Sequence, residues 1–170
     1  SDVKVDARIN SSQLRVDNDS VGLVNLTAGY DAKTGKLPFT VISDNKDYNI
    51  RANGFYSLAD SAQQPLFTNI QLSDTRINFV EQFLTGIFSD IDGRATGQLS
   101  IQGNPTSPTL LGEVSVQNAA LKVDYTQVHY QIDSLRVKFL EDGIDFGKFT
   151  IRDQYNNKAS GSGKLYEKQF

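Results

Sequence analysis

Apolar and polar residues alternate along most of this chain. From Val3 to Ile9, aliphatic side chains occupy every second position, and charged or amide side chains lie between them. A period of two is typical of a β-strand, whose successive side chains point to opposite faces of a sheet. The same rhythm returns in short stretches of five or six residues as far as Phe149 and Ile151. The pattern therefore predicts an all-β protein whose sheet has one apolar and one polar face.

Short segments rich in Asn, Asp and Gly separate these stretches, and such residues tolerate the backbone angles of tight turns. The segments are Asn18-Asp19, Lys33-Thr34-Gly35, Gly103-Asn104-Pro105, Gln117-Asn118, Glu141-Asp142-Gly143 and Tyr155-Asn156-Asn157. Parallel strands need crossovers of a dozen residues or more, so these short connections predict an antiparallel meander. Residues 59–64 (ADSAQQ) are expected to form an exposed loop.

One segment departs from the period of two. Phe79, Phe83, Ile87 and Phe88 lie at helical spacing, which predicts a short amphipathic helix around residues 79–91, ended by residues 90–93. The segment lacks the Lys and Arg residues that a helix on a membrane surface usually displays. We therefore expect the helix to fill core space.

A sheet with a single apolar face can bury that face in two ways. It can pack against a second sheet and form a sandwich, or it can curl around its own apolar face and leave a trough. The 170 residues suit one unit of either kind. Taken alone, the alternation favours the sandwich and leaves the trough open as an alternative.

Composition narrows the possible functions. The formal net charge is −3 and the cationic residues are scattered, so we expect no nucleic-acid partner. Cysteine is absent, which excludes disulfides and thiolate metal sites. The sequence contains no apolar run of about 18 residues, so no transmembrane helix is expected in this segment. The first residues are charged and include neither a starting Met nor a signal peptide. We therefore expect the chain to be a segment of a larger protein.

Candidate catalytic residues are few. The single histidine, His129, falls on the polar side of its strand, and no serine lies in a nucleophile-elbow motif. Asp90 and Asp92 lack the further ligands of a calcium loop, and we interpret them as a helix end and turn. No GxGxxG or Walker pattern is present. We therefore expect no enzymatic activity, no metal and no cofactor.

The second half of the chain resembles a known family. The features that carry the resemblance follow the helical segment in this order: Gly93, Gly97 and Gly103; Pro108 and Gly112; Asn118-Ala119; Val123-Asp124-Tyr125; Val128 and Tyr130; residues 143–146; residues 151–153; Asn157, Gly161 and Gly163. This order over residues 78–170 resembles the C-terminal region of the TamB family, the AsmA-like proteins of the bacterial envelope. The final residues resemble a Gly-x-Ile-x-His-x-x-Phe ending, but Glu167 stands where the family pattern has His.

The resemblance implies a fold and a function. The fold would be a long antiparallel sheet curled into an open half-pipe, a β-taco, with an apolar concave face. The chain would be a periplasmic segment of an inner-membrane-anchored envelope protein of a diderm bacterium. It would shelter phospholipid acyl chains between the inner and outer membranes and support outer-membrane assembly with an Omp85-type partner. The alternative is a scaffold or chaperone that receives outer-membrane protein strands by β-augmentation.

The candidate floor of the groove consists of fourteen alternating apolar residues. They are Val114, Val116, Leu121, Val123, Tyr125, Tyr130, Ile132, Leu135, Val137, Phe139, Ile144, Phe146, Phe149 and Ile151. In a closed sandwich the same residues would be ordinary core. An open trough would leave apolar surface exposed, so we expect the isolated segment to bind amphiphiles or to self-associate.

Overall fold

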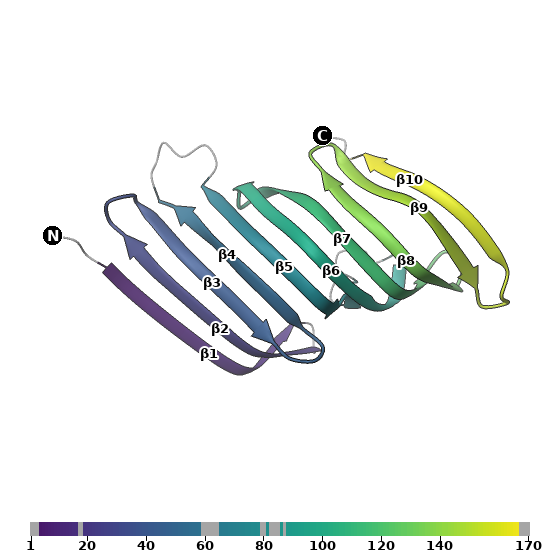
Figure 1. Ribbon diagram of the computed structural model, residues 1–170, viewed down its shortest axis with the longest axis horizontal. Helices are drawn as coiled ribbons and strands as arrows, with labels where there is room; N and C mark the ends of the chain where they lie inside the picture. The colour runs from purple at the N-terminus through teal and green to yellow at the C-terminus, as the bar shows by residue number, and fades with distance from the viewer. Residues whose placement is uncertain are drawn as a thin grey trace.

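A single antiparallel sheet makes up the molecule. The computed structural model describes residues 4–16, 19–58, 65–78, 81, 86 and 88–166, and all ten strands in these ranges join one sheet in chain order, from β1 to β10 (Figure 1). The strands are β1 (Lys4–Val16), β2 (Asp19–Asp31), β3 (Lys36–Asp44), β4 (Asn49–Ser57), β5 (Leu66–Arg76), β6 (Phe88–Asn104), β7 (Ser107–Val123), β8 (Val128–Leu140), β9 (Gly143–Asp153) and β10 (Lys158–Tyr166). The predicted meander is confirmed.

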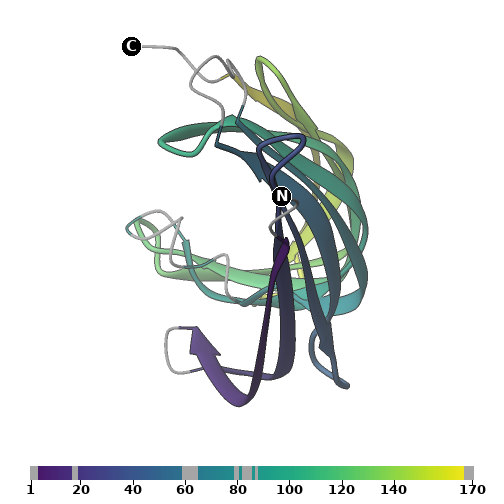
Figure 2. The same ribbon diagram turned by 90° about the vertical axis from the view of Figure 1, so that its left-hand side faces the viewer.

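The sheet is curled into an open half-pipe. The strands stack side by side along the long axis of the molecule (Figure 1), and each strand bends around that axis, so that the end-on view is C-shaped (Figure 2). Within the described chain, β1 pairs only with β2 and β10 only with β9, so the stack does not close on itself. Of the two architectures that the alternation allowed, the structure has the trough.

The apolar core lies along the concave face of this sheet. In a single layer, side chains can be buried only by one another, and curvature brings them together on the concave side. Seven buried residues form the core cluster: Leu72, Ala95, Val114, Val116, Ala119, Ile132 and Val137. They come from β5, β6, β7 and β8, so the best-packed part of the trough is at the centre of the sheet.

At two glycines, the central strands lie too close together for a side chain. A Cβ atom added at Gly97 of β6 would lie 2.7 Å from the Cα of Val114 and closer still to the carbonyl oxygen of Glu113. Gly112 of β7 has φ +125°, and a Cβ there would lie 2.9 Å from the Cα of Leu99. Neither position has room for a side chain, which explains why glycine interrupts the apolar pattern at both places.

The strands are longer than the predicted five or six residues, ranging from 9 to 17. The difference arises because some residues interpreted as turns lie within strands. Gln117-Asn118 was predicted as a turn, but both residues lie inside β7, where Asn118 has φ 50°. Asp90 also lies inside a strand, with φ 52°. Asn and Asp tolerate this conformation, so here they mark irregular strand positions as readily as turns.

The predicted helix around residues 79–91 is wrong at its C-terminal end. Phe88 to Ile91 begin β6, where Phe88 pairs with Val123, and residues 90–93 continue the strand. Pairing with β7 thus overrides the helical spacing. Phe79, Phe83 and Ile87 lie outside the described residues, as do the predicted loop at 59–64 and Glu167.

Candidate functional site: an apolar trough

Most of the predicted floor residues come together on the concave face. Val114, Val116, Ile132 and Val137 are buried members of the core cluster. Packed against them, and only partly buried, are Leu121, Leu135, Phe139, Ile144, Phe146 and Ile151. Ten of the fourteen predicted residues therefore lie in one continuous apolar surface.

The register of the strands explains how this surface forms. Val114 of β7 lies opposite Gly97 of β6 and Val137 of β8, so one apolar row crosses three strands. A second row joins Ala119 of β7, Ile132 of β8 and Ile151 of β9. Because neighbours in a row lie directly opposite one another, their side chains are in contact along the axis of the trough. The rows run across the strands and therefore along the pipe.

Four predicted residues are placed differently. Val123, Tyr130 and Phe149 are half-buried and lie outside the core cluster. Tyr125 is 96% exposed and lies in the turn between β7 and β8, so its placement in the floor is wrong. Leu121, Val123 and Tyr125 share the period of two, but β7 ends at Val123. The alternation ran on into the turn by coincidence.

Sequence reasoning also missed part of the trough. Leu72 of β5, Ala95 of β6 and Ala119 of β7 are buried in its centre, and Ile50, Ile70, Ile77 and Leu99 pack against them. Leu72, Ile70, Ile50 and Leu99 belong to alternating stretches that predicted strands, and that signal was available. The two alanines gave little signal, because a small residue is compatible with either face. The trough therefore extends from β4 to β9.

The convex face carries the charges. Glu113 of β7 forms ion pairs with Arg136 at 3.1 Å and with Lys138 at 3.5 Å, both in β8. On the next strands, Lys164 lies 3.5 Å from Asp145. These pairs alternate with trough residues along the same strands, so polar side chains face solvent. Exposed pairs of this kind contribute little to stability. They make the outer face of the sheet charged and solvated.

His129 lies in a polar cluster at one end of the strands. Its Nε2 is 3.1 Å from Oδ2 of Asp90, and Nζ of Lys122 is 3.7 Å from the same carboxylate. The hydrogen bond with His129, and then the charge of Lys122, lower the pKa of Asp90. Asp90 and Asp92 both lie within β6, so their interpretation as a helix end is wrong. The cluster ties β6, β7 and β8 together on the exposed side.

No group of three or more His, Cys, Asp or Glu side chains in the described part of the chain is placed to hold a metal ion. No helix among the described residues is long and apolar enough to cross a membrane.

The fold and the trough define a class of protein: an elongated single-sheet β protein whose concave face is apolar. Comparison with protein families, curated proteins and solved structures found no match for this chain.

Proposed function

We propose that the chain shelters lipid acyl chains in its apolar trough, as a segment of a cell-envelope bridge protein of the TamB type. One observation carries the proposal. Leu121, Leu135, Phe139, Ile144 and Phe146 belong to the apolar surface at the centre of the sheet, yet each remains partly exposed. Every described strand belongs to the same sheet, so no second described sheet covers them. A soluble protein rarely leaves such a contiguous apolar surface without a ligand or partner for it.

The physical chemistry of the trough suits an acyl chain. Removing each methylene group from water contributes roughly 0.8 kcal/mol, so a lipid tail gains by lying along the aliphatic rows. Between β6 and β9 the residues of the apolar surface are Val, Ile, Leu, Ala and Phe. Interchangeable aliphatic contacts give a nearly even energy profile along the axis. Such a profile favours movement of a tail over its tight storage.

The cellular setting of the proposal comes from the sequence resemblance. Bridge proteins of the TamB type span the periplasm of diderm bacteria and act with an Omp85-type outer-membrane partner. In that setting the polar head of a phospholipid would stay in water at the open side of the trough while its tails lie against the floor. The charged convex face would keep the bridge soluble.

Photo-crosslinking tests the lipid proposal. A benzophenone side chain would replace Phe139 or Phe146, two half-buried aromatic residues of the trough, in chain exposed to vesicles of phosphatidylethanolamine and phosphatidylglycerol. Lys138, next to Phe139 and exposed on the opposite face, is the matched control position. We expect lipid adducts at both trough positions and none at Lys138. Equal labelling at all three positions, or none at any, would refute the proposal, provided that circular dichroism shows intact sheet.

A strand-binding scaffold remains the second candidate, because β10 has one unpaired edge in the described chain. A partner strand could pair with this edge by β-augmentation. A photoreactive residue at Ser162 of β10 distinguishes the two functions. Adducts with an unfolded outer-membrane protein at Ser162, without lipid adducts at Phe139 and Phe146, would favour the scaffold.

A further inference from the structure

The ladder between β8 and β9 is interrupted in its middle. Tyr130 to Ile132 pair with Ile151 to Asp153 at one end, and Lys138 to Leu140 pair with Gly143 to Asp145 at the other. Residues 133–137 and 146–150, between these ends, are not paired across the seam. The ladders on either side are paired at the same position along the strands: Val137 pairs with Val114 of β7, and Phe149 pairs with Gly161 of β10. The interruption therefore belongs to this seam alone among the three ladders.

The ladder is interrupted because the apolar side chains of the two strands switch to the other alternation at different positions along the strands. In β8, Ile132 and Leu135 both belong to the trough although they are three residues apart, so β8 changes face at residues 133–134. β7 changes face directly opposite, at Asn118, and stays paired with β8. In β9 the change follows Phe146, at Gly147, which has φ +59°. Between these heights, residues that lie opposite each other would point to different faces, so a regular ladder cannot form.

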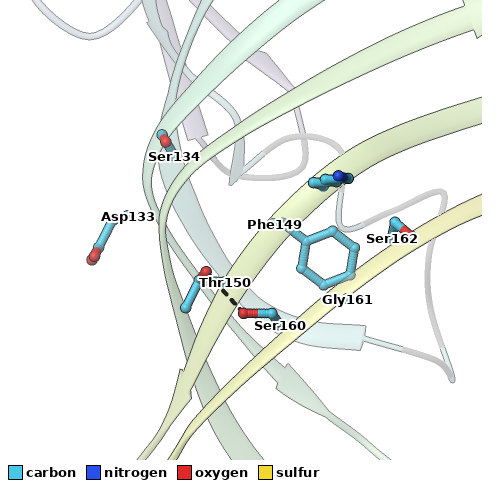
Figure 3. A pocket seen from close by; sticks show the side chains of 8 residues that line it. Asp133, Ser134, Phe149, Thr150, Ser160, Gly161 and Ser162 are labelled. Carbon is cyan, nitrogen blue, oxygen red and sulfur yellow. Dashed lines mark hydrogen bonds between the residues drawn. The ribbon is translucent and has the colours of Figure 1, made fainter.

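A polar cavity occupies the interrupted seam (Figure 3). Asp133 and Ser134 of β8, Thr150 of β9, and Ser160 and Ser162 of β10 line it together with the ring of Phe149. Oγ1 of Thr150 and Oγ of Ser160 are 3.3 Å apart, and the Phe149 ring lies 3.0 Å from the position of a Cβ on Gly161. Both contacts join β9 to β10 and add to the backbone pairing of the hairpin.

By backbone pairing, β9 is joined more continuously to β10, with nine paired positions, than to β8, with six in two separate groups. Ile144, Phe146 and Ile151 of β9 pack against the core cluster, and a polar contact across the seam is an ion pair between Arg152 and Asp133 at 3.5 Å, with the Asp133 side chain 84% exposed. Such a pair contributes little. Only the residues Glu141 and Asp142 connect β8 to β9, and both are exposed. Among the ladders of the described strands, this one has the longest stretch without backbone pairing. Local opening begins where backbone pairing is incomplete, which favours this seam.

We propose that the sheet opens at this seam and that two copies of the chain exchange their β9–β10 hairpins, giving a domain-swapped dimer. A strand that replaces β9 must match the irregular face change of β8, must place apolar residues opposite Ile132 and Phe139, and must place an acidic residue opposite Lys138. Ile151, Ile144 and Asp145 meet these requirements, and the same strand of a second copy meets them by identity. Reciprocal exchange restores every seam contact and closes with twofold symmetry.

A pair of cysteines at the seam tests the exchange. Lys138 and Asp145 lie directly opposite each other in β8 and β9, so Lys138→Cys with Asp145→Cys links β8 to whichever β9 is paired with it. The chain would be refolded at low and at high concentration and then oxidised. We expect mostly covalent monomer from the dilute sample and mostly covalent dimer from the concentrated sample on a non-reducing gel.

The matched control uses the neighbouring, uninterrupted ladder. Glu113 lies opposite Lys138 across β7 and β8, so Glu113→Cys with Lys138→Cys should give covalent monomer at both concentrations. Light scattering of the unaltered chain, refolded at the same two concentrations, provides a readout without substitutions, and we expect a dimer that persists on dilution. Covalent monomer alone from the Lys138–Asp145 pair at high concentration would overturn the exchange, as would a concentrated unaltered chain that stays monomeric.

Discussion

Neighbouring strands approach each other most closely at single residues at which no side chain fits. At Gly97 the carbonyl of Glu113 and the Cα of Val114 occupy the space of a Cβ atom, whereas nothing lies within 4 Å of the corresponding position at Gly163. A new methyl group at Gly97 would force the backbones of β6 and β7 apart. The two glycines therefore make a matched pair for testing the close approach of these strands.

We expect Gly97→Ala to lower the free energy of unfolding by about 2 kcal/mol, a typical cost of overpacking against backbone that cannot move away. Gly163→Ala should change it by less than about 0.5 kcal/mol, as substitutions away from close contacts usually do. Urea denaturation followed by circular dichroism measures both. Similar losses for the two variants would mean that Gly97 is not a point of close approach.

At the scale of single residues, the alternation predicted which side chains lie on the apolar face of the sheet, but it did not predict where a strand ends. Ten of the fourteen predicted floor residues lie in the core cluster or against it. Tyr125 does not, because the turn at residues 124–127 begins two residues earlier than the pattern suggested. The period of two describes the direction of a side chain within a strand and carries no information once the strand has ended.

Among the elements, the β9–β10 turn depends on one carboxylate. Asp153 accepts hydrogen bonds from the backbone N–H groups of Tyr155 at 2.9 Å and Asn157 at 2.8 Å, and from the Asn157 side chain at 2.9 Å. The Asn157 side-chain bond, followed by the two backbone bonds, lowers the pKa of Asp153 below its ordinary value of 3.8. The ionised carboxylate is the form that fits the turn.

A lowered pKa sets the direction of the pH dependence. The stabilising contribution of Asp153 is fully present above pH 3.8, the pKa of the unfolded chain, and is lost as the pH falls through the lower pKa of the folded state. We expect the amides of Tyr155 and Asn157 to shift together on acidification through that range, followed by NMR. Asp153→Asn should abolish the shift, and Asp142→Asn, in the preceding turn, should preserve it. An unchanged titration of the two amides in Asp153→Asn would contradict this account.

The lengths of the elements were the least predictable feature. β7 contains 17 residues because Asn118 is absorbed as an irregular position inside the strand. Lys33-Thr34-Gly35, by contrast, forms the turn that its residues predicted. Both segments contain a residue that tolerates the backbone angles of a turn, Asn118 in one and Gly35 in the other. Only pairing distinguishes them, since Gln117 and Ala119 of β7 have partners in β8 on both sides of Asn118.

At the scale of the whole molecule, the stability of each strand depends mainly on its pairing with the two strands next to it. Each strand touches chiefly the strands before and after it, so opening can begin at either end and proceed inwards. We expect the slowest amide exchange in β6 and β7, which hold the centre of the core cluster, and faster exchange towards β2 and β10. Native-state hydrogen exchange with mass spectrometry measures the gradient. Equal protection in all ten strands would show that the sheet unfolds as one unit.

The choice between trough and sandwich illustrates what the sequence determines at this scale. One apolar face per strand is common to both architectures, and the alternation alone favoured the sandwich. The resemblance favoured the half-pipe, and the structure has that shape (Figure 2). The seam between β8 and β9 was not predictable, because it arises from the relative heights of two face changes, at residues 133–134 and at Gly147, and that relation exists only after the strands are in register.

Because the strands stack along the axis of the pipe, the length of the trough is counted in strands. Neighbouring strands are roughly 4.8 Å apart, so ten of them span on the order of 43 Å, more than the hydrocarbon thickness of roughly 30 Å of a single leaflet pair. Each further strand would add the same increment without altering the cross-section. In a protein built in this way, the insertion or deletion of one hairpin changes the length of the trough by a fixed step of about 10 Å.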